Sequence, residues 1–86
     1  MNSQHRIPDE ALNIPKLQPG VYRHYKGTKY EVIGVSLDTE TLVPYVIYRT
    51  LHPAKPLYWT RPYAMFIETV TVDGKEMPRF ELLTLS

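Results

Sequence analysis

The sequence contains no cysteine in its 86 residues. It therefore has no disulfide bond, no thiolate ligand for a metal and no thiol nucleophile. Secreted domains of this size usually depend on disulfides, because such a small chain buries only about 60–65% of the surface that it exposes when unfolded. The absence of cysteine therefore predicts a protein of a reducing compartment, the cytoplasm.

Long apolar runs are missing as well. Residues 1–18 contain charges and prolines and no apolar run approaching the roughly seven residues that a secretory signal peptide needs. Nothing elsewhere approaches the roughly 20 apolar residues that span a membrane. We therefore expect neither a signal peptide nor a membrane partner.

The sequence also lacks a strong excess of either charge. Ten Lys and Arg residues stand against nine Asp and Glu residues, a net charge of +1, whereas nucleic-acid-binding domains are usually strongly basic. The distribution is more informative than the total, because residues 42–63 carry Arg49, Lys55 and Arg61 and no acidic residue. The middle of the chain is locally basic.

Motifs for catalysis and for cofactors are absent too. The four glycines are scattered singly, so there is no phosphate-binding loop, and no Gly-x-Ser-x-Gly motif presents a nucleophile. The three histidines, His5, His24 and His52, fall in a tail, a strand and a proline-rich loop, without the close spacing of metal ligands. We expect no metal, no cofactor and no covalent catalysis.

What the chain does contain is the pattern of a small β domain. Residues 1–18 are interpreted as an N-terminal tail with one short helical signal at residues 9–14, and residues 19–86 as a single domain. There, short β-branched and aromatic runs alternate with Gly, Pro and Asp at intervals of roughly ten residues. The expected strands are 21–26, 29–36, 43–51, 57–60, 67–72 and 75–83.

These strands predict a mainly β fold with five or six short strands and one helical turn. Gly27 and the pair Asp73-Gly74 indicate hairpin turns, and Pro62 suits the start of a helical turn at residues 62–66. We expect a small bent sheet that closes into an SH3-like barrel. An open β-meander packed under the N-terminal segment is the alternative.

Two segments, GVYRHYKG at residues 20–27 and WTRPYAMF at residues 59–66, carry a family resemblance. Together they make residues 17–82 resemble an uncharacterised bacterial family, the domain of unknown function numbered 1653. The resemblance implies a short prokaryotic protein and brings no assigned activity.

Aromatic and basic residues occur together in this sequence, and a site that stacks a ring and holds an anion needs such residues. In the first strand, Tyr22 and His24 share one face and Arg23 and Tyr25 the other, so only half of that run can serve one ligand. The alternative is that tyrosines fill the core and arginine stems cover its rim. The candidate ligand-binding residues are Arg23, His24, Tyr48, Trp59 and Arg61.

Arg61 stands out among these candidates. Pro62 restricts the residue before it to an extended conformation, which fixes the direction of the Arg61 side chain. An arginine held beside Trp59 suits an anion. The alternative is an ion pair with Glu68 that leaves nothing free for a ligand.

These observations favour a non-catalytic binding module that recognises a small anionic or aromatic ligand or a peptide segment. One alternative is single-stranded nucleic-acid binding, which stacking rings and the basic middle favour and the low net charge opposes. Another is an enzyme acting on a small metabolite, with His24 or a carboxylate as base and Glu31 or Glu68 orienting the histidine. A third is a homodimer that buries the aromatic patch; otherwise we expect a monomer.

Overall fold

The computed structural model describes residues 14–51 and 57–85. They form one helical turn, α1 (Tyr63–Phe66), and the strands β1 (Gly20–His24), β2 (Lys29–Leu37), β3 (Pro44–Thr50), β4 (Tyr58–Pro62), β5 (Thr69–Val72), β6 (Lys75–Pro78) and β7 (Phe80–Leu85). The mainly β prediction is confirmed. The predicted helical signal at residues 9–14 and the loop at residues 52–56 lie almost wholly outside the described residues.

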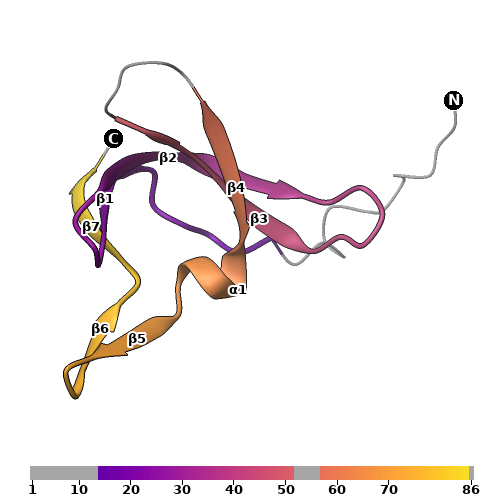
Figure 1. Ribbon diagram of the computed structural model, residues 1–86. Helices are drawn as coiled ribbons and strands as arrows, with labels where there is room; N and C mark the ends of the chain where they lie inside the picture. The colour runs from indigo at the N-terminus through magenta and orange to yellow at the C-terminus, as the bar shows by residue number, and fades with distance from the viewer. Residues whose placement is uncertain (1–13, 52–56, 86) are drawn as a thin grey trace, which may run out of the picture.

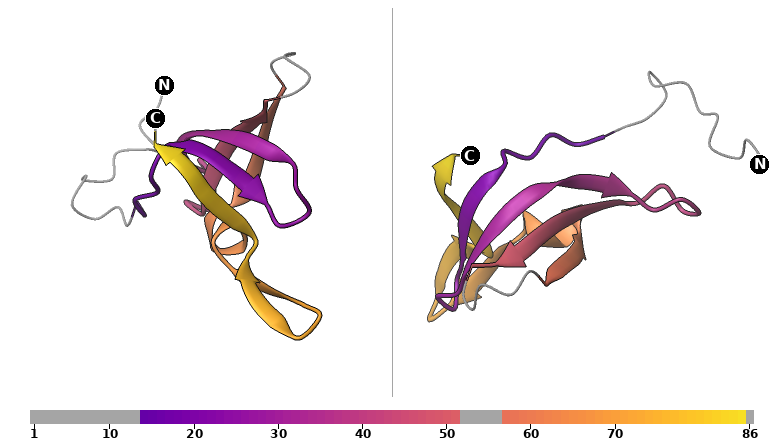
Figure 2. Two further views of the ribbon diagram at one scale, coloured as in Figure 1. Left: turned by 90° about the vertical axis from the view of Figure 1, so that its left-hand side faces the viewer. Right: turned by 90° about the horizontal axis from the view of Figure 1, so that it is seen from above.

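Five of the strands form one antiparallel sheet in the order β4-β3-β2-β1-β7. Strands β5 and β6 pair only with each other, and their hairpin projects away from the larger sheet (Figures 1 and 2). The predicted turns are confirmed, because Gly27 has a φ of 110° and Asp73 and Gly74 have φ values of 52° and 78°.

The number of strands differs from the prediction of five or six. The run 75–83 does not continue as one strand, because Pro78 lacks a backbone N–H and Arg79 bends away. Strand β6 therefore ends at Pro78 and pairs with β5, and β7 begins at Phe80 and pairs with β1. One predicted strand becomes two strands in two different sheets.

The larger sheet is strongly curved, and irregular pairing at two places contributes to the curvature. In β2 the register passes from Val32 opposite Tyr48 to Gly34 opposite Ile47, which leaves Ile33 as an extra residue. In β7 a similar shift leaves Leu83 without a partner in β1. Extra residues of this kind bend a strand and increase its twist.

The core lies on the concave face of this sheet. It consists of Tyr22, Val32, Val46, Tyr48, Phe66 and Phe80. Phe66 is the buried residue of α1, whose ribbon lies beneath the curved sheet (Figure 1). The end of the N-terminal tail contacts the same core. Leu17 packs against it, and the Tyr22 hydroxyl donates a hydrogen bond to the Gln18 carbonyl oxygen at 2.7 Å.

Closure of the sheet into a barrel is not confirmed. Strands β4 and β7 are the two edges, and no backbone pairing joins them within the described part of the chain. The curvature nevertheless brings side chains of the two edges together, because the guanidinium carbon of Arg61 in β4 lies 5.6 Å from the ring centroid of Phe80 in β7. We call this meeting place the seam.

No helix among the described residues is long and apolar enough to cross a membrane.

Candidate functional site

Phe80 is the aromatic centre of the seam. Its ring stacks on Phe66 with centroids 4.0 Å apart, and the rings of His24 and Tyr48 meet it edge-on at 4.9 and 5.7 Å. Arg61 approaches the same ring from β4. Because residues from β1, β3, β4 and α1 all contact Phe80, this one side chain positions the groups around it. We define the seam cluster as His24, Tyr48, Arg61, Arg79 and Phe80.

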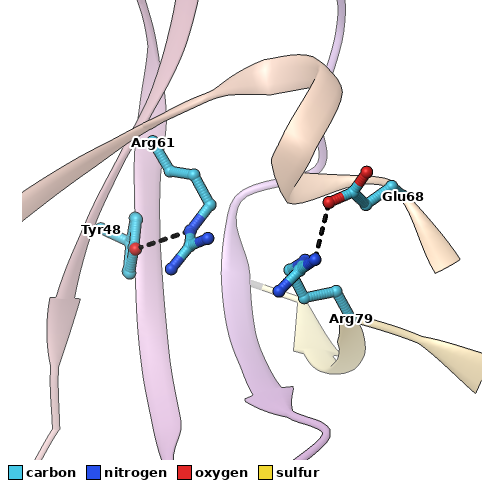
Figure 3. Close-up of polar contacts among 4 residues, drawn as sticks. All are labelled: Tyr48, Arg61, Glu68 and Arg79. Carbon is cyan, nitrogen blue, oxygen red and sulfur yellow. Dashed lines mark hydrogen bonds and ion pairs between the residues drawn. The ribbon is translucent and has the colours of Figure 1, made fainter. Parts of the chain in front are cut away.

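Arg61 reaches the seam from the edge strand β4. Its Nε donates a hydrogen bond to the Tyr48 hydroxyl oxygen at 3.3 Å, as Figure 3 shows. Three ion pairs form within residues 14–51 and 57–85, and Arg61 belongs to none of them. Its two terminal nitrogens therefore carry a positive charge without a carboxylate of the described chain.

The alternative that pairs Arg61 with Glu68 is wrong. Glu68 binds Arg79 at 2.7 Å (Figure 3), and the Arg79 backbone N–H also donates to the Glu68 carbonyl. This double contact holds Arg79 beside the start of β7. The Nε of Arg79 is buried and has no acceptor among the described residues.

His24 lies at the end of β1 and is half-buried. Its Nδ1 accepts the backbone N–H of Lys26 at 3.1 Å. In the neutral ring the proton must therefore be on Nε2, which is a donor. Burial lowers the pKa of the His24 imidazole from its usual 6.5, and the charges of Arg61, Arg79 and Lys26 lower it further.

The balance of charge around His24 is positive. Among the described residues, Lys26, Arg61 and Arg79 are the charged groups that lower the pKa of its ring. Glu68 offsets the charge of Arg79, which leaves two positive charges unmatched beside a neutral histidine. A half-buried site with this balance favours an anion, since partial burial weakens the screening by water.

The other two predicted site residues are placed differently. Arg23 alternates with His24 along β1, so it lies on the opposite face, where it pairs with Glu81 at 2.9 Å. Trp59 is opposite Tyr48 in the β3–β4 register and is 44% exposed, and its indole N–H donates to the Thr50 hydroxyl at 3.1 Å. The structure thus brings together His24, Tyr48 and Arg61, places Trp59 at the rim on the same face, and separates Arg23 from them.

Arg23 instead lines a pocket of about 460 Å³ together with Tyr25, Met77, Pro78 and Glu81. Its charged lining residues, Arg23 and Glu81, neutralise each other. This pocket therefore offers no unmatched charge to a ligand, in contrast to the seam cluster.

Two carboxylates were candidates for orienting His24 in a catalytic role. Glu31 pairs with Arg49 at 2.7 Å, and Glu68 pairs with Arg79. Among the described residues, the hydrogen-bond partner of the His24 ring is the backbone N–H of Lys26, which Nδ1 accepts, and not a carboxylate. In residues 14–51 and 57–85 no group of three His, Asp or Glu side chains is placed to hold a metal; His5 and His52 lie outside these ranges.

Two members of the seam cluster, Phe80 and Arg79, were not among the predicted site residues. Their position depends on the pairing of β7 with β1, which joins residues more than fifty positions apart. The only local signal was Pro78, which marks an irregularity immediately before them.

Comparisons with known proteins agree on one family. The model of the family of proteins of unknown function DUF1653 matches residues 20–82. The chain is also similar to the crystal structure of a DUF1653 protein from Bordetella bronchiseptica, with 35% sequence identity, a TM-score of 0.73 and coverage of 83% of this chain and 92% of that chain. No curated protein matches the sequence.

Proposed function

The chain belongs to the DUF1653 family, and we propose that it is a non-catalytic binding module that holds an anionic ligand, or an acidic group of a peptide, at the seam cluster. The observation that carries this proposal is the guanidinium of Arg61, which has no carboxylate partner among residues 14–51 and 57–85 and contacts Tyr48 and Phe80. Arginines at a half-buried position ordinarily find a carboxylate or phosphate, because burying an unpaired charge costs free energy.

The arrangement of the sheet supports this role. In the described part of the chain, the two edges of the sheet meet through side chains and not through backbone hydrogen bonds, and His24 and Arg61 at the seam are only partly buried. We propose that the curved sheet acts as a small SH3-like barrel, with the seam in place of a closed wall, and that it works in the cytoplasm.

A non-catalytic role is favoured over an enzyme that uses His24. A general base needs an orienting partner, and both candidate carboxylates already bind arginines. The nearby cations also favour the neutral imidazole, which suits a hydrogen-bond donor to an anion.

Single-stranded nucleic acid is the second candidate ligand. It is favoured by the exposed rings of Tyr58 and Trp59, which lie on the same edge strand as Arg61. Base stacking on exposed rings contributes about 1–3 kcal/mol per base, and phosphate contacts make such binding strongly dependent on salt.

The test is an NMR titration of the isotope-labelled protein with an acidic peptide, adenosine monophosphate and oligothymidylate, at low and moderate salt. We expect saturable shifts centred on Arg61, Tyr48 and His24 for at least one of these ligands. The substitution Arg61→Gln should abolish them. Lys75→Gln, which removes the same charge from the exposed β5–β6 hairpin, should leave them unchanged.

Shifts that spread over Tyr58 and Trp59 with oligothymidylate and fall steeply with salt would identify nucleic acid as the ligand. Shifts that Arg61→Gln and Lys75→Gln reduce equally would reflect net charge alone. That outcome, or no saturable shift with any ligand, would refute the seam as a binding site.

A further inference from the structure

The proposed function leaves the class of anion open, and the donors of the seam cluster narrow it. Resting on that function, we propose that the seam cluster binds a tetrahedral dianion, a phosphate group either free or attached to a larger molecule, and that His24 takes up a proton as this anion binds. The inference identifies His24 as both a ligand-binding residue and the origin of a pH dependence.

The charge balance favours a dianion over a single carboxylate. Lys26, Arg61 and Arg79 supply three positive charges near His24, and Glu68 neutralises only one of them. A carboxylate would leave one positive charge unmatched, whereas a phosphate dianion would match both. A phosphate group carries about −1.5 to −2 charges at neutral pH and has several strong acceptor oxygens.

The donors also suit a ligand with several oxygens. The Nε of Arg61 is occupied by Tyr48, so the two terminal nitrogens remain as a fork. The Tyr48 hydroxyl accepts that bond and keeps its own O–H to donate. His24 adds Nε2–H, since Lys26 occupies its Nδ1. A planar guanidinium fork pairs with two phosphate oxygens at once, and the other donors can serve a third.

The surroundings of His24 explain why its ring would take up a proton when an anion binds. The charges that act on its ring come from Arg61 in β4, Arg79 in the segment before β7 and Lys26 in the turn after β1. The uncharged neighbours are Phe80 at 4.9 Å and Tyr25 at 4.5 Å between ring centroids, and Glu68 is engaged by Arg79. A bound dianion would reverse the sign of this environment, because an opposite charge within about 4–6 Å favours the protonated ring. Nε2 already carries a hydrogen, so the added proton goes to Nδ1, and the hydrogen bond from the Lys26 N–H is given up when the ring becomes charged.

The test uses sulfate as the first probe, since it remains a dianion throughout the range in which histidine titrates. Its affinity is measured by calorimetry at about pH 5.5 and about pH 8, on either side of the ordinary histidine range. The His24 ring signals are followed by NMR with and without sulfate. We expect sulfate to bind several-fold more tightly at the lower pH; a rise of about one unit in the pKa of a single group gives at most about a tenfold change.

Variants identify the groups responsible. His24→Gln keeps an N–H donor but cannot titrate, so it should flatten the pH dependence of sulfate affinity. Arg61→Gln should remove sulfate binding, and Lys75→Gln should behave as wild type at both pH values. Inorganic phosphate and adenosine monophosphate are compared in parallel. Tighter binding of the nucleotide would show that the phosphate is carried by a larger molecule, and equal binding would indicate the free ion; either result supports the shared chemistry.

The outcomes separate this inference from the proposed function. Sulfate that binds at Arg61 with the same affinity at both pH values would overturn the role of His24 and leave the binding module intact. An acidic peptide that binds while sulfate and phosphate do not would overturn the ligand class alone. Absence of binding by every anion would overturn both.

Discussion

Replacement of Phe80 by leucine is expected to weaken the fold and the site together. Leucine keeps an apolar side chain at this position but removes the ring against which five neighbours lie: His24, Tyr30, Tyr48, Arg61 and Phe66. Those neighbours include the stacked Phe66 at 4.0 Å and Arg61 at 5.6 Å, and Phe80 itself is only 6% exposed. Tyr48 links the same two edges, because it contacts both Arg61 and Phe80.

The expected cost follows from these contacts. Truncating a buried Phe to Ala costs about 3–5 kcal/mol, and each aromatic pair contributes about 0.5–1.5 kcal/mol beyond its buried area. Because leucine restores part of the lost volume, we expect Phe80→Leu to lower the free energy of unfolding by about 2 kcal/mol. For a domain of this size that corresponds to a Tm lower by about 8–16 °C.

The assay is urea unfolding followed by far-UV circular dichroism, with Leu82→Ala as the control. Leu82 is on the same strand and is 38% exposed, so its truncation should cost less than about 1 kcal/mol. If Phe80→Leu cost no more than Leu82→Ala, Phe80 would not be the centre of the core, and the argument that it positions Arg61 and His24 would fail.

Three further predictions concern single contacts. Tyr48→Phe removes the acceptor of Arg61 Nε, so it should cost about 1 kcal/mol in urea unfolding and weaken anion binding; unchanged values for both would contradict the contact. Because the pKa of His24 in the folded protein lies below its usual 6.5, the unfolded chain binds a proton at this residue more readily. The free energy of unfolding should therefore be highest above about pH 6.5 and fall as the pH drops through the folded pKa. His24→Gln should reduce this loss, as measured in thermal melts. Gly20→Ala should lower the free energy of unfolding by more than about 2 kcal/mol, since φ is 150° there and the added Cβ would collide with a β7 carbonyl. Gly34→Ala, with open space around it, should change the midpoint of urea unfolding little.

Local features of the fold could be predicted from the sequence because nearby residues determine them. The positive φ of Gly27 and of the Asp73-Gly74 pair follows from the turn chemistry of glycine and aspartate. The helical turn was expected at residues 62–66 from the fixed φ of proline; it begins one residue later, at Tyr63, because Pro62 has an extended ψ of 135° and ends β4. The alternation in β3 correctly assigned Val46 and Tyr48 to one face, and both are buried.

The features that the sequence did not reveal depend on residues far apart in the chain. The run that contains Pro78 reads as one strand until the two sheets that it serves are known. The pairing of Glu68 with Arg79, and not with Arg61, requires knowing where β7 lies. The same holds for Arg23, because its predicted face was right but its partner Glu81 comes from β7.

The sequence predicted the types of residue in the candidate site, but only some of the individual residues that form it. His24, Tyr48 and Arg61 come together because the curved sheet brings both of its edges onto Phe80. The bulge at Ile33, which contributes to that curvature, lies beside Gly34. An isolated glycine within a strand indicates a bulge, but it does not indicate which side chains the curvature brings together.

The central claim is that the seam holds an anion through Arg61, and a crystal structure of the protein grown with selenate tests it most directly. Selenate is a tetrahedral dianion, and its anomalous scattering locates it independently of the protein density. We expect a selenate within hydrogen-bonding distance of the Arg61 terminal nitrogens and in contact with Tyr48 or His24. A seam without selenate, with Arg61 paired to a carboxylate of its own chain, would contradict it.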